Sequence, residues 1–441
     1  MRKISALILA LLMSKVWAQQ STPIPGPKRT PGDLQEVTEE GEFPASDLPA
    51  AVQTRNTVRL RRHAWSIFAG LTSQDDNKIK APIFLTWFTK ANLFAEPPSE
   101  DKGKFGLEPP KQVVPLSVAP VATLSKVFFN LPAARAIVDG MLNTLQPPGV
   151  PSPTQPERVR LNCAFGDTRP EDRHIKDFPA QSVVLKTVWR LVSAGDTKPG
   201  ELTAIPVWDP ESNTPGRGGN NPDLSYGPEQ WSRYVAVNTH PDRYKGLAHA
   251  LVRPKDSRNV QQAPIVPLDR FYYKQIDSGI LAEAQRLNRA AKLGDYFVLV
   301  GLHVTTKEIP NWFWITFWWH DHPDAGPFAA NRPSSVLGPW RNYLMNISYD
   351  MEFPEEADGS PHVNFNPYLE GLTPGGLKTN CMTCHRLSTS PGLRPDTTPG
   401  TILDSDPRFD HRLKMGFLWS LTDFGGSKDP AYDPKSCPPR Q

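Results

Sequence analysis

Five consecutive residues near the C-terminus carry the clearest chemical signal in the sequence: Cys381-Met382-Thr383-Cys384-His385. This C-x-x-C-H pattern is the attachment signature of a c-type haem. In such a site the two thiols form thioether bonds to the porphyrin, and the adjacent histidine binds the iron as its proximal axial ligand. We therefore expect one covalent haem c, anchored by Cys381 and Cys384, with His385 bound to the iron.

Three other uses of the two cysteines are open. A zinc site needs two further ligands at ordinary spacing, and no second C-x-x-C or H-x-x-x-H pattern lies nearby. A thioredoxin-like dithiol follows a strand and opens a helix, whereas residues 371–376, ahead of the motif, are glycine-rich and typical of a loop. A disulfide between Cys381 and Cys384 is the third alternative, and it gives His385 no role.

The chemistry of a haem iron depends on the second axial ligand and on the pocket around it. A sulfur or imidazole ligand favours electron transfer, and an open position admits O₂, peroxide or a substrate. Met415 lies 30 residues after His385 in an apolar segment and is the candidate distal iron ligand. Met345 and Met351 precede the motif and are weaker candidates. A methionine in an apolar segment is more often part of the core, so the sequence leaves this ligand open.

The densest group of chemically capable side chains is residues 312–322, W-F-W-I-T-F-W-W-H-D-H, which ends in His320 and His322. Strand alternation places positions 312, 314, 316 and 318 on one face of the chain. Together with His303, these two histidines are candidate catalytic residues, as an iron ligand or a proton donor beside a substrate pocket. The alternatives are an aromatic core strand that ends in a polar turn, and a structural hydrogen bond for His303. A metal site at His-Asp-His lacks an evident third ligand.

Haem propionates need cationic or hydrogen-bonding partners. Arg332, Arg341 and Arg386 lie near the aromatic and haem segments in the sequence and are available for this role. Each is equally well explained as a surface arginine.

The N-terminus predicts export. Arg2 and Lys3 precede the apolar run 4–13, and Val16-Trp17-Ala18 has the small residues that signal peptidase reads, so we expect cleavage after Ala18. The run is too short for a stable membrane anchor, and no later apolar stretch approaches the roughly 18 residues of a membrane span. Because c-type haem is attached after export, these signals together predict a periplasmic protein.

Two cysteines remain outside the motif, Cys163 and Cys437. In an oxidising compartment an even remainder favours a disulfide between them. Closing so long a loop contributes about 4–5 kcal/mol in chain-entropy models. Two unpaired cysteines are the alternative.

Composition predicts an α+β fold with a β-rich body, many proline-rich loops and a C-terminal irregular or helical haem-binding segment. The chain has 441 residues, of which 48 are proline, and such chains favour loops and strands over helical bundles. We expect a signal peptide (1–18), a flexible segment (19–56), the body (57–345) and the haem segment (346–441). Hydrophobic periodicity predicts these elements: helices at 132–145 and 277–292, and strands at 182–192, 202–208, 265–273, 296–304 and 312–319, the last two forming a hairpin.

Several segments together resemble a group of large proteobacterial monohaem proteins labelled only as cytochrome c family. These are residues 301–306, 312–321, 365–370 and 380–385. The resemblance covers the C-terminal third and implies one covalent haem. It implies no substrate, because none is assigned to that group.

The first functional hypothesis is a periplasmic monohaem c-type cytochrome in electron transfer with a periplasmic redox partner. The alternative is a haem-dependent oxidoreductase, peroxidase-like or oxygenase-like, whose small-molecule substrate pocket is lined by residues 312–322. A haem-based sensor or binding protein is a third possibility. A net charge of +3 is too small to indicate nucleic-acid or membrane binding.

Overall fold

The computed structural model describes residues 43–73, 81–90, 93, 124–140, 163, 165, 168–208, 227–228, 231–254, 259–349, 362–371, 373, 375–397 and 400–422. Within these residues the protein is α+β with a β-rich body, which confirms the predicted fold class. The predicted signal peptide lies outside the described residues. None of the described helices has the length and apolar character needed to cross a membrane.

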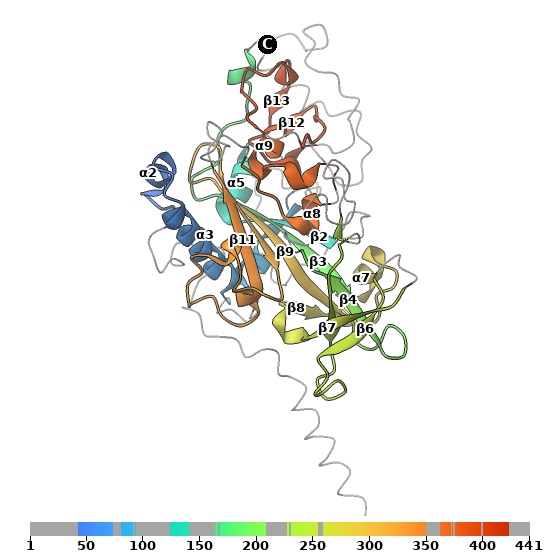
Figure 1. Cartoon of the computed structure of the whole chain (residues 1–441). Coiled ribbons are helices and arrows are strands. Elements are labelled where there is room, and N and C mark those ends of the chain that lie inside the picture. Colours follow the sequence, from blue (N-terminus) through green and yellow to red (C-terminus); the bar gives the residue numbers. More distant parts are fainter. Residues whose placement is uncertain are drawn as a thin grey trace, which may run out of the picture.

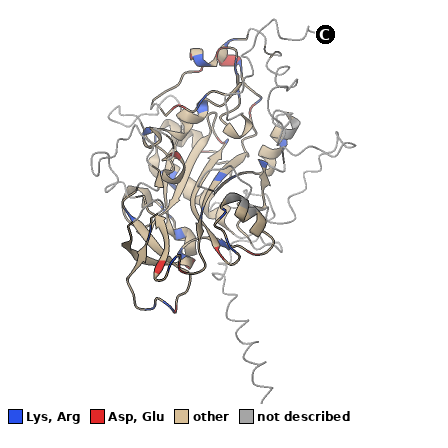
Figure 2. Cartoon of the chain, turned by 90° about the vertical axis from the view of Figure 1, so that its right-hand side faces the viewer, with Lys and Arg blue, Asp and Glu red and all other residues tan. Residues whose placement is uncertain are grey.

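A seven-stranded antiparallel sheet forms the centre of the molecule (Figure 1). Its strands follow the order β1-β2-β3-β9-β10-β11, and β8 pairs with the outer part of β9. Few charged residues lie in the strands, which are mostly tan in Figure 2. The strands span these residues: β1 Phe88–Thr89, β2 Leu124–Phe129, β3 Val183–Val192, β8 Tyr273–Gln275, β9 Tyr296–Thr306, β10 Phe313–Trp319 and β11 Tyr343–Ser348.

The predicted hairpin of the last two apolar runs is confirmed as β9 and β10. Phe313 pairs with Thr306, and Trp318 pairs with Gly301. A nearly all-apolar run and an aromatic-rich run, joined by residues 305–311, predicted this pair from the sequence. β11 pairs with β10 and continues the sheet. It crosses the predicted boundary between residues 345 and 346, so the body and the haem segment each contribute residues to this strand.

One face of the sheet, here called the α3 face, packs against a long N-terminal helix. Helix α3 (Thr57–Thr72) follows the short α2 (Leu48–Gln53) and begins at Asn56, whose side chain accepts a hydrogen bond from the backbone N–H of Arg59 at 3.1 Å. The Phe68 ring stacks on Phe317 of β10 with ring centroids 4.1 Å apart. Burial of these aromatic rings is the main apolar contribution to the core on this side.

The opposite face, here called the motif face, carries Val184, Lys186, His303, Thr305 and Trp314, which the strand register places side by side. The described residues between 362 and 422 pack over it (Figure 1). This covering layer consists of short elements: α8 Pro367–Glu370, α9 Cys381–Arg386, β12 Thr389–Ser390 and β13 Leu413–Lys414, together with α5 Leu131–Asp139.

A small closed barrel extends from one end of the sheet. Its strands are β4 (Glu201–Pro206), β5 (Tyr234–Asn238), β7 (Gln261–Pro267) and β6 (His249–Val252). The predicted strand at 265–273 is wrong in extent, because β7 ends at Pro267, where a 3₁₀ turn over Leu268–Arg270 follows.

Two predicted helices are shorter than expected. Helix α7 covers Leu281–Leu287 instead of 277–292, because the side chain of Asp277 accepts hydrogen bonds from the N–H groups of Gly279 and Ile280 and forms a turn there. Asn288 has extended backbone angles and ends the helix. Helix α5 covers Leu131–Asp139, and residues 141–145 of its predicted range lie outside the described residues.

Candidate functional site

Helix α9 positions the C-x-x-C-H motif on the motif face. Asn380 caps the helix, since its side chain accepts a hydrogen bond from the Met382 N–H at 3.0 Å and donates one to the His362 carbonyl at 3.0 Å. Residues three and four apart share one side of a helix. Cys381, Cys384 and His385 therefore lie on the same side of this single turn.

His385 is held in one tautomer. Its Nδ1 lies 2.8 Å from the carbonyl oxygen of Phe417 and donates to it, so Nε2 carries the lone pair. Burial lowers the pKa of His385 to about 4, although the bond to Phe417 opposes the shift, and the imidazole is neutral at pH 7. A neutral imidazole whose second nitrogen donates to a backbone carbonyl is the usual arrangement of a metal-ligating histidine.

Both cysteines of the motif are free thiols, so the disulfide alternative is not what the structure contains. The Cys381 thiol donates to the Asn364 carbonyl at 3.0 Å. Burial raises the pKa of Cys381 well above its usual value and that of Cys384 to about 12, with a further contribution from Glu370. These thiols lack the low pKa that thiol–disulfide exchange requires. The described residues contain no group of three or more metal-binding side chains.

Aromatic and aliphatic side chains surround the motif. The Trp314 ring lies 4.5 Å from the His385 ring, centroid to centroid, and the Trp312 indole N–H donates to the Gly416 carbonyl at 3.0 Å. The aromatic block therefore has two roles, since Trp312 and Trp314 wall the motif while Phe313, Ile315 and Phe317 belong to the core. The apolar cluster around the motif also includes Phe129, Ala133, Ile137, Phe178, Val184, Met382, Met415, Leu418 and Leu421.

The candidate sulfur ligands lie in different places. Met415 is buried in the same apolar cluster as Cys381, in the segment that also supplies the Phe417 carbonyl. Met345 pairs with Phe317 and lies on the α3 face, on the other side of the sheet from the motif. Met351 lies outside the described residues. Of the three candidate ligands, Met415 is therefore the one that the described residues place near the motif.

His303 lies beside the motif within a polar group that the sequence did not indicate. Its Nε2 is 3.1 Å from both carboxylate oxygens of Glu370, which also accepts from the Asn366 N–H at 2.5 Å. Lys186 is the direct cross-strand neighbour of His303. Burial raises the pKa of Glu370, but His303, the Asn366 N–H and Lys186 together outweigh it, and the pKa lies below its usual value. One sequence feature could have indicated Lys186, namely that it is a charged residue within a strand that is otherwise mostly apolar.

Asn366 fixes the position of this carboxylate over the sheet. Its side-chain N–H groups donate to the Thr316 hydroxyl at 3.0 Å and to the Phe317 carbonyl at 2.8 Å. The Asn366 side chain can lie this close to the sheet because residue 301 is a glycine. An added Cβ there would lie 2.9 Å from the Asn366 Oδ1. A side chain at position 301 would therefore displace α8 and Glu370.

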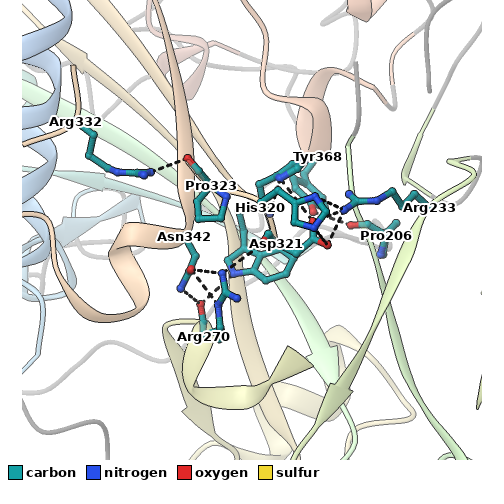
Figure 3. Close-up of polar contacts among 11 residues, drawn as sticks. Pro206, Arg233, Arg270, His320, Asp321, Pro323, Arg332, Asn342 and Tyr368 are labelled. Carbon is teal, nitrogen blue, oxygen red and sulfur yellow. Dashed lines mark hydrogen bonds and ion pairs between the residues drawn. The ribbon is translucent and has the colours of Figure 1, made fainter. Parts of the chain in front are cut away.

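His320 and His322 follow the C-terminal end of β10, and Figure 3 shows His320 and Asp321 beside Arg233. His320 lies six positions along the chain from Trp314, whose ring touches His385, and this corresponds to about 20 Å of strand. Arg233 binds both carboxylate oxygens of Asp321 at 2.7 and 2.6 Å, and the His320 Nδ1 accepts from the His322 N–H at 2.9 Å. This is the polar turn that the sequence offered as the alternative interpretation.

The three candidate arginines also lie in two places: two are near the turn after β10, and one is in the motif helix. Arg332 donates to the carbonyls of Pro323 and Tyr343, and Arg341 lines an open cleft of about 570 Å³ beside the same turn. Arg386 belongs to α9, forms an ion pair with Asp404 and lies 5.2 Å above the Phe417 ring. Arg386 is therefore the arginine that the fold brings to the motif.

Cys163 is disulfide-bonded. Cys381 and Cys384 are free, so Cys437 is the one cysteine of the sequence left to pair with it, and it lies outside the described residues. The Cys163–Cys437 pairing stays a prediction.

Comparisons with known proteins give no independent assignment of this site. No family model, no curated protein and no solved structure matches the chain.

Proposed function

We propose that the chain carries one covalently attached haem c, with Cys381 and Cys384 as the thioether anchors and His385 as the proximal iron ligand. The observation that carries the proposal is the His385 Nδ1–H bond to the Phe417 carbonyl, in a helical turn that also presents both free thiols. This donor set matches a haem iron and its porphyrin. It matches zinc and a redox dithiol poorly, for the reasons given above.

The residues around the motif have definable tasks toward such a group. Phe417 fixes the imidazole plane and leaves Nε2 for the iron, while Trp312 and Trp314 exclude water from the apolar pocket. Arg386, the last residue of α9, would supply a cation for a propionate. The haem itself supplies an iron that changes its oxidation state and binds small ligands.

We propose that the protein is a haem-dependent oxidoreductase. Lys186, His303 and Glu370 support this role, because ionisable side chains beside a haem bind and protonate substrates. A carrier that only passes electrons has no need of such a group. On the N-terminal sequence we place the protein in the periplasm.

Electron transfer is the second candidate function. Met415 favours it, since its side chain is buried in the apolar cluster that contains Cys381. A thioether ligand on the second side of the iron would close that position to substrates.

Haem attachment is tested by expressing the chain with a c-type haem maturation system. The intact mass is expected to equal the processed polypeptide plus one haem, and colour should survive acid–acetone extraction. Cys381→Ala combined with Cys384→Ala should abolish covalent attachment. Met382→Leu, inside the motif but at a position without a proposed bond, is the matched control and should keep the haem. A colourless wild-type protein of bare polypeptide mass would disprove the proposal.

The two roles are separated by the ligand state of the iron. A high-spin ferric spectrum that changes on addition of azide or cyanide supports the oxidoreductase. A low-spin spectrum with a sulfur-to-iron charge-transfer band that disappears in Met415→Ala supports electron transfer instead.

A further inference from the structure

Two residues in the middle of the sheet, Lys186 and His303, keep some solvent access beneath the layer that covers the motif face. β3 lies between β2 and β9, and β9 lies between β3 and β10, so their central residues are expected to be fully covered. From Val183 to Trp189 every residue of β3 is buried except Lys186, and from Phe297 to Thr306 every residue of β9 is buried except His303. These two exceptions face each other across the strands. Residual access at two paired central positions marks a local hollow beneath the covering layer.

The hollow adjoins the motif. Charges on His303, Glu370 and Lys186 all act on His385, and Glu370 also acts on both motif thiols. The side chains of His303 and Glu370 keep 15% and 23% of their surface accessible, although they lie within the molecule. A porphyrin held by the motif would therefore have these side chains as neighbours.

Two polar groups in the hollow have unused hydrogen-bonding capacity. Thr305 is only 6% exposed, and its hydroxyl has no hydrogen-bond partner in the part of the chain that the structure describes. It shares the motif face with Trp314, whose ring touches His385. A buried hydroxyl without a partner destabilises the folded protein, and a bound ligand would remove that cost.

The second group is the ammonium of Lys186. It interacts with Glu370, but no direct ion pair joins the two within the described residues. Glu370 is instead held by His303 at 3.1 Å and by the Asn366 N–H at 2.5 Å. Diagonal neighbours on paired strands lie about 7 Å apart, within reach of a lysine side chain, so Lys186 and Thr305 can contact one small molecule.

We propose that Lys186 and Thr305, with His303 beside them, form the polar floor of a pocket that binds a small inorganic anion next to the haem. The inference rests on the haem-binding proposal and specifies the substrate class of that site. The cation of Lys186 supplies the attraction and the Thr305 hydroxyl donates a hydrogen bond, while the Glu370 carboxylate is held by His303 and by the Asn366 N–H. The surrounding apolar walls strengthen these contacts by excluding water.

The test is the azide affinity of the ferric holoprotein, measured by absorption titration, compared with the CO affinity of the ferrous form. In Lys186→Met the dissociation constant for azide should rise about tenfold or more, because a charge-assisted bond is lost. Thr305→Val, which keeps the side-chain shape, should raise it several-fold. Affinity for CO, a neutral ligand, should stay within about twofold in both variants.

Lys126→Met is the matched control. Lys126 is a buried lysine of the same sheet, but it is paired with Thr187 and lies on the α3 face. Its replacement should leave azide affinity unchanged. Equal azide affinity in wild type and Lys186→Met, an equal loss in both lysine variants, or a wild-type haem that does not bind azide would each overturn the anion pocket while leaving haem attachment intact. A wild-type protein without haem would instead defeat the proposed function.

Discussion

The Nδ1 atom of His385 lies 2.8 Å from the carbonyl oxygen of Phe417, a residue 32 positions further along the chain. This bond ties the C-x-x-C-H helix to the segment that follows it. The same segment is attached to the sheet, because the Trp312 indole donates to the Gly416 carbonyl. The orientation of the imidazole therefore depends on β10 as well as on the motif.

Trp312→Phe tests this connection. Loss of the indole bond is expected to destabilise the protein by about 1 kcal/mol beyond the cost of the smaller ring. Trp318→Phe is the matched control, because Trp318 is similarly buried but its indole N–H has no partner among the described residues. Urea unfolding of both variants gives the difference. Equal destabilisation of the two variants would show that the Gly416 contact contributes nothing.

Replacing Asn380 tests the cap of α9. Asn380→Ala removes the acceptor for the Met382 N–H and should destabilise the folded protein by about 1 kcal/mol. Asn380→Asp keeps the acceptor and should retain most of the stability. Thermal unfolding followed by circular dichroism compares them, and an alanine variant as stable as wild type would contradict the capping role.

The His303–Glu370 pair predicts a pH-dependent contribution to stability. The folded-state pKa of Glu370 lies below its unfolded value of 4.5, so the pair stabilises the protein at pH values above 4.5. That stability is lost as the pH falls through the folded-state pKa. Glu370→Gln should destabilise the protein by about 1–3 kcal/mol at pH 7 and by less at pH 4.

Denaturant unfolding at the two pH values checks this prediction. Asp172→Asn is the control, because Asp172 is an exposed carboxylate paired only with the exposed Arg169, and its variant should match wild type at both pH values. A Glu370→Gln variant with the same loss at pH 4 and pH 7 would rule out the ionised pair.

The separation between His303, which lies beside the motif, and His322, which lies beyond β10, gives a further prediction. His322→Ala should leave the visible spectrum and ligand affinity of the holoprotein unchanged, because the side chain is 70% exposed and lies beyond the far end of β10. His303→Ala should alter the azide affinity or the spectrum. A spectral change in His322→Ala, measured on the oxidised and reduced proteins, would contradict the separation of the two groups.

The motif and the strongly patterned strands were predictable from local sequence. Residues 381–385 have a spacing with one dominant chemical meaning, and a helical turn brings them together without help from the rest of the chain. β3 was predictable from its alternation, β9 from its short and nearly all-apolar run, and β10 from its aromatic-rich run. Helix α7 was overestimated, since the Asp277 turn and the extended Asn288 compete with a periodicity that continues past both.

Tertiary structure alone decided which side chains accompany the motif. Lys186, His303 and Glu370 come from three separate segments, and only the strand register and the Asn366 contacts bring them together. His303, His320 and His322 were equal site candidates on the sequence alone. The direction of β10 separates them. His303 pairs with Thr316, two residues from Trp314, whereas His320 lies at the other end of the strand, about 20 Å from Trp314.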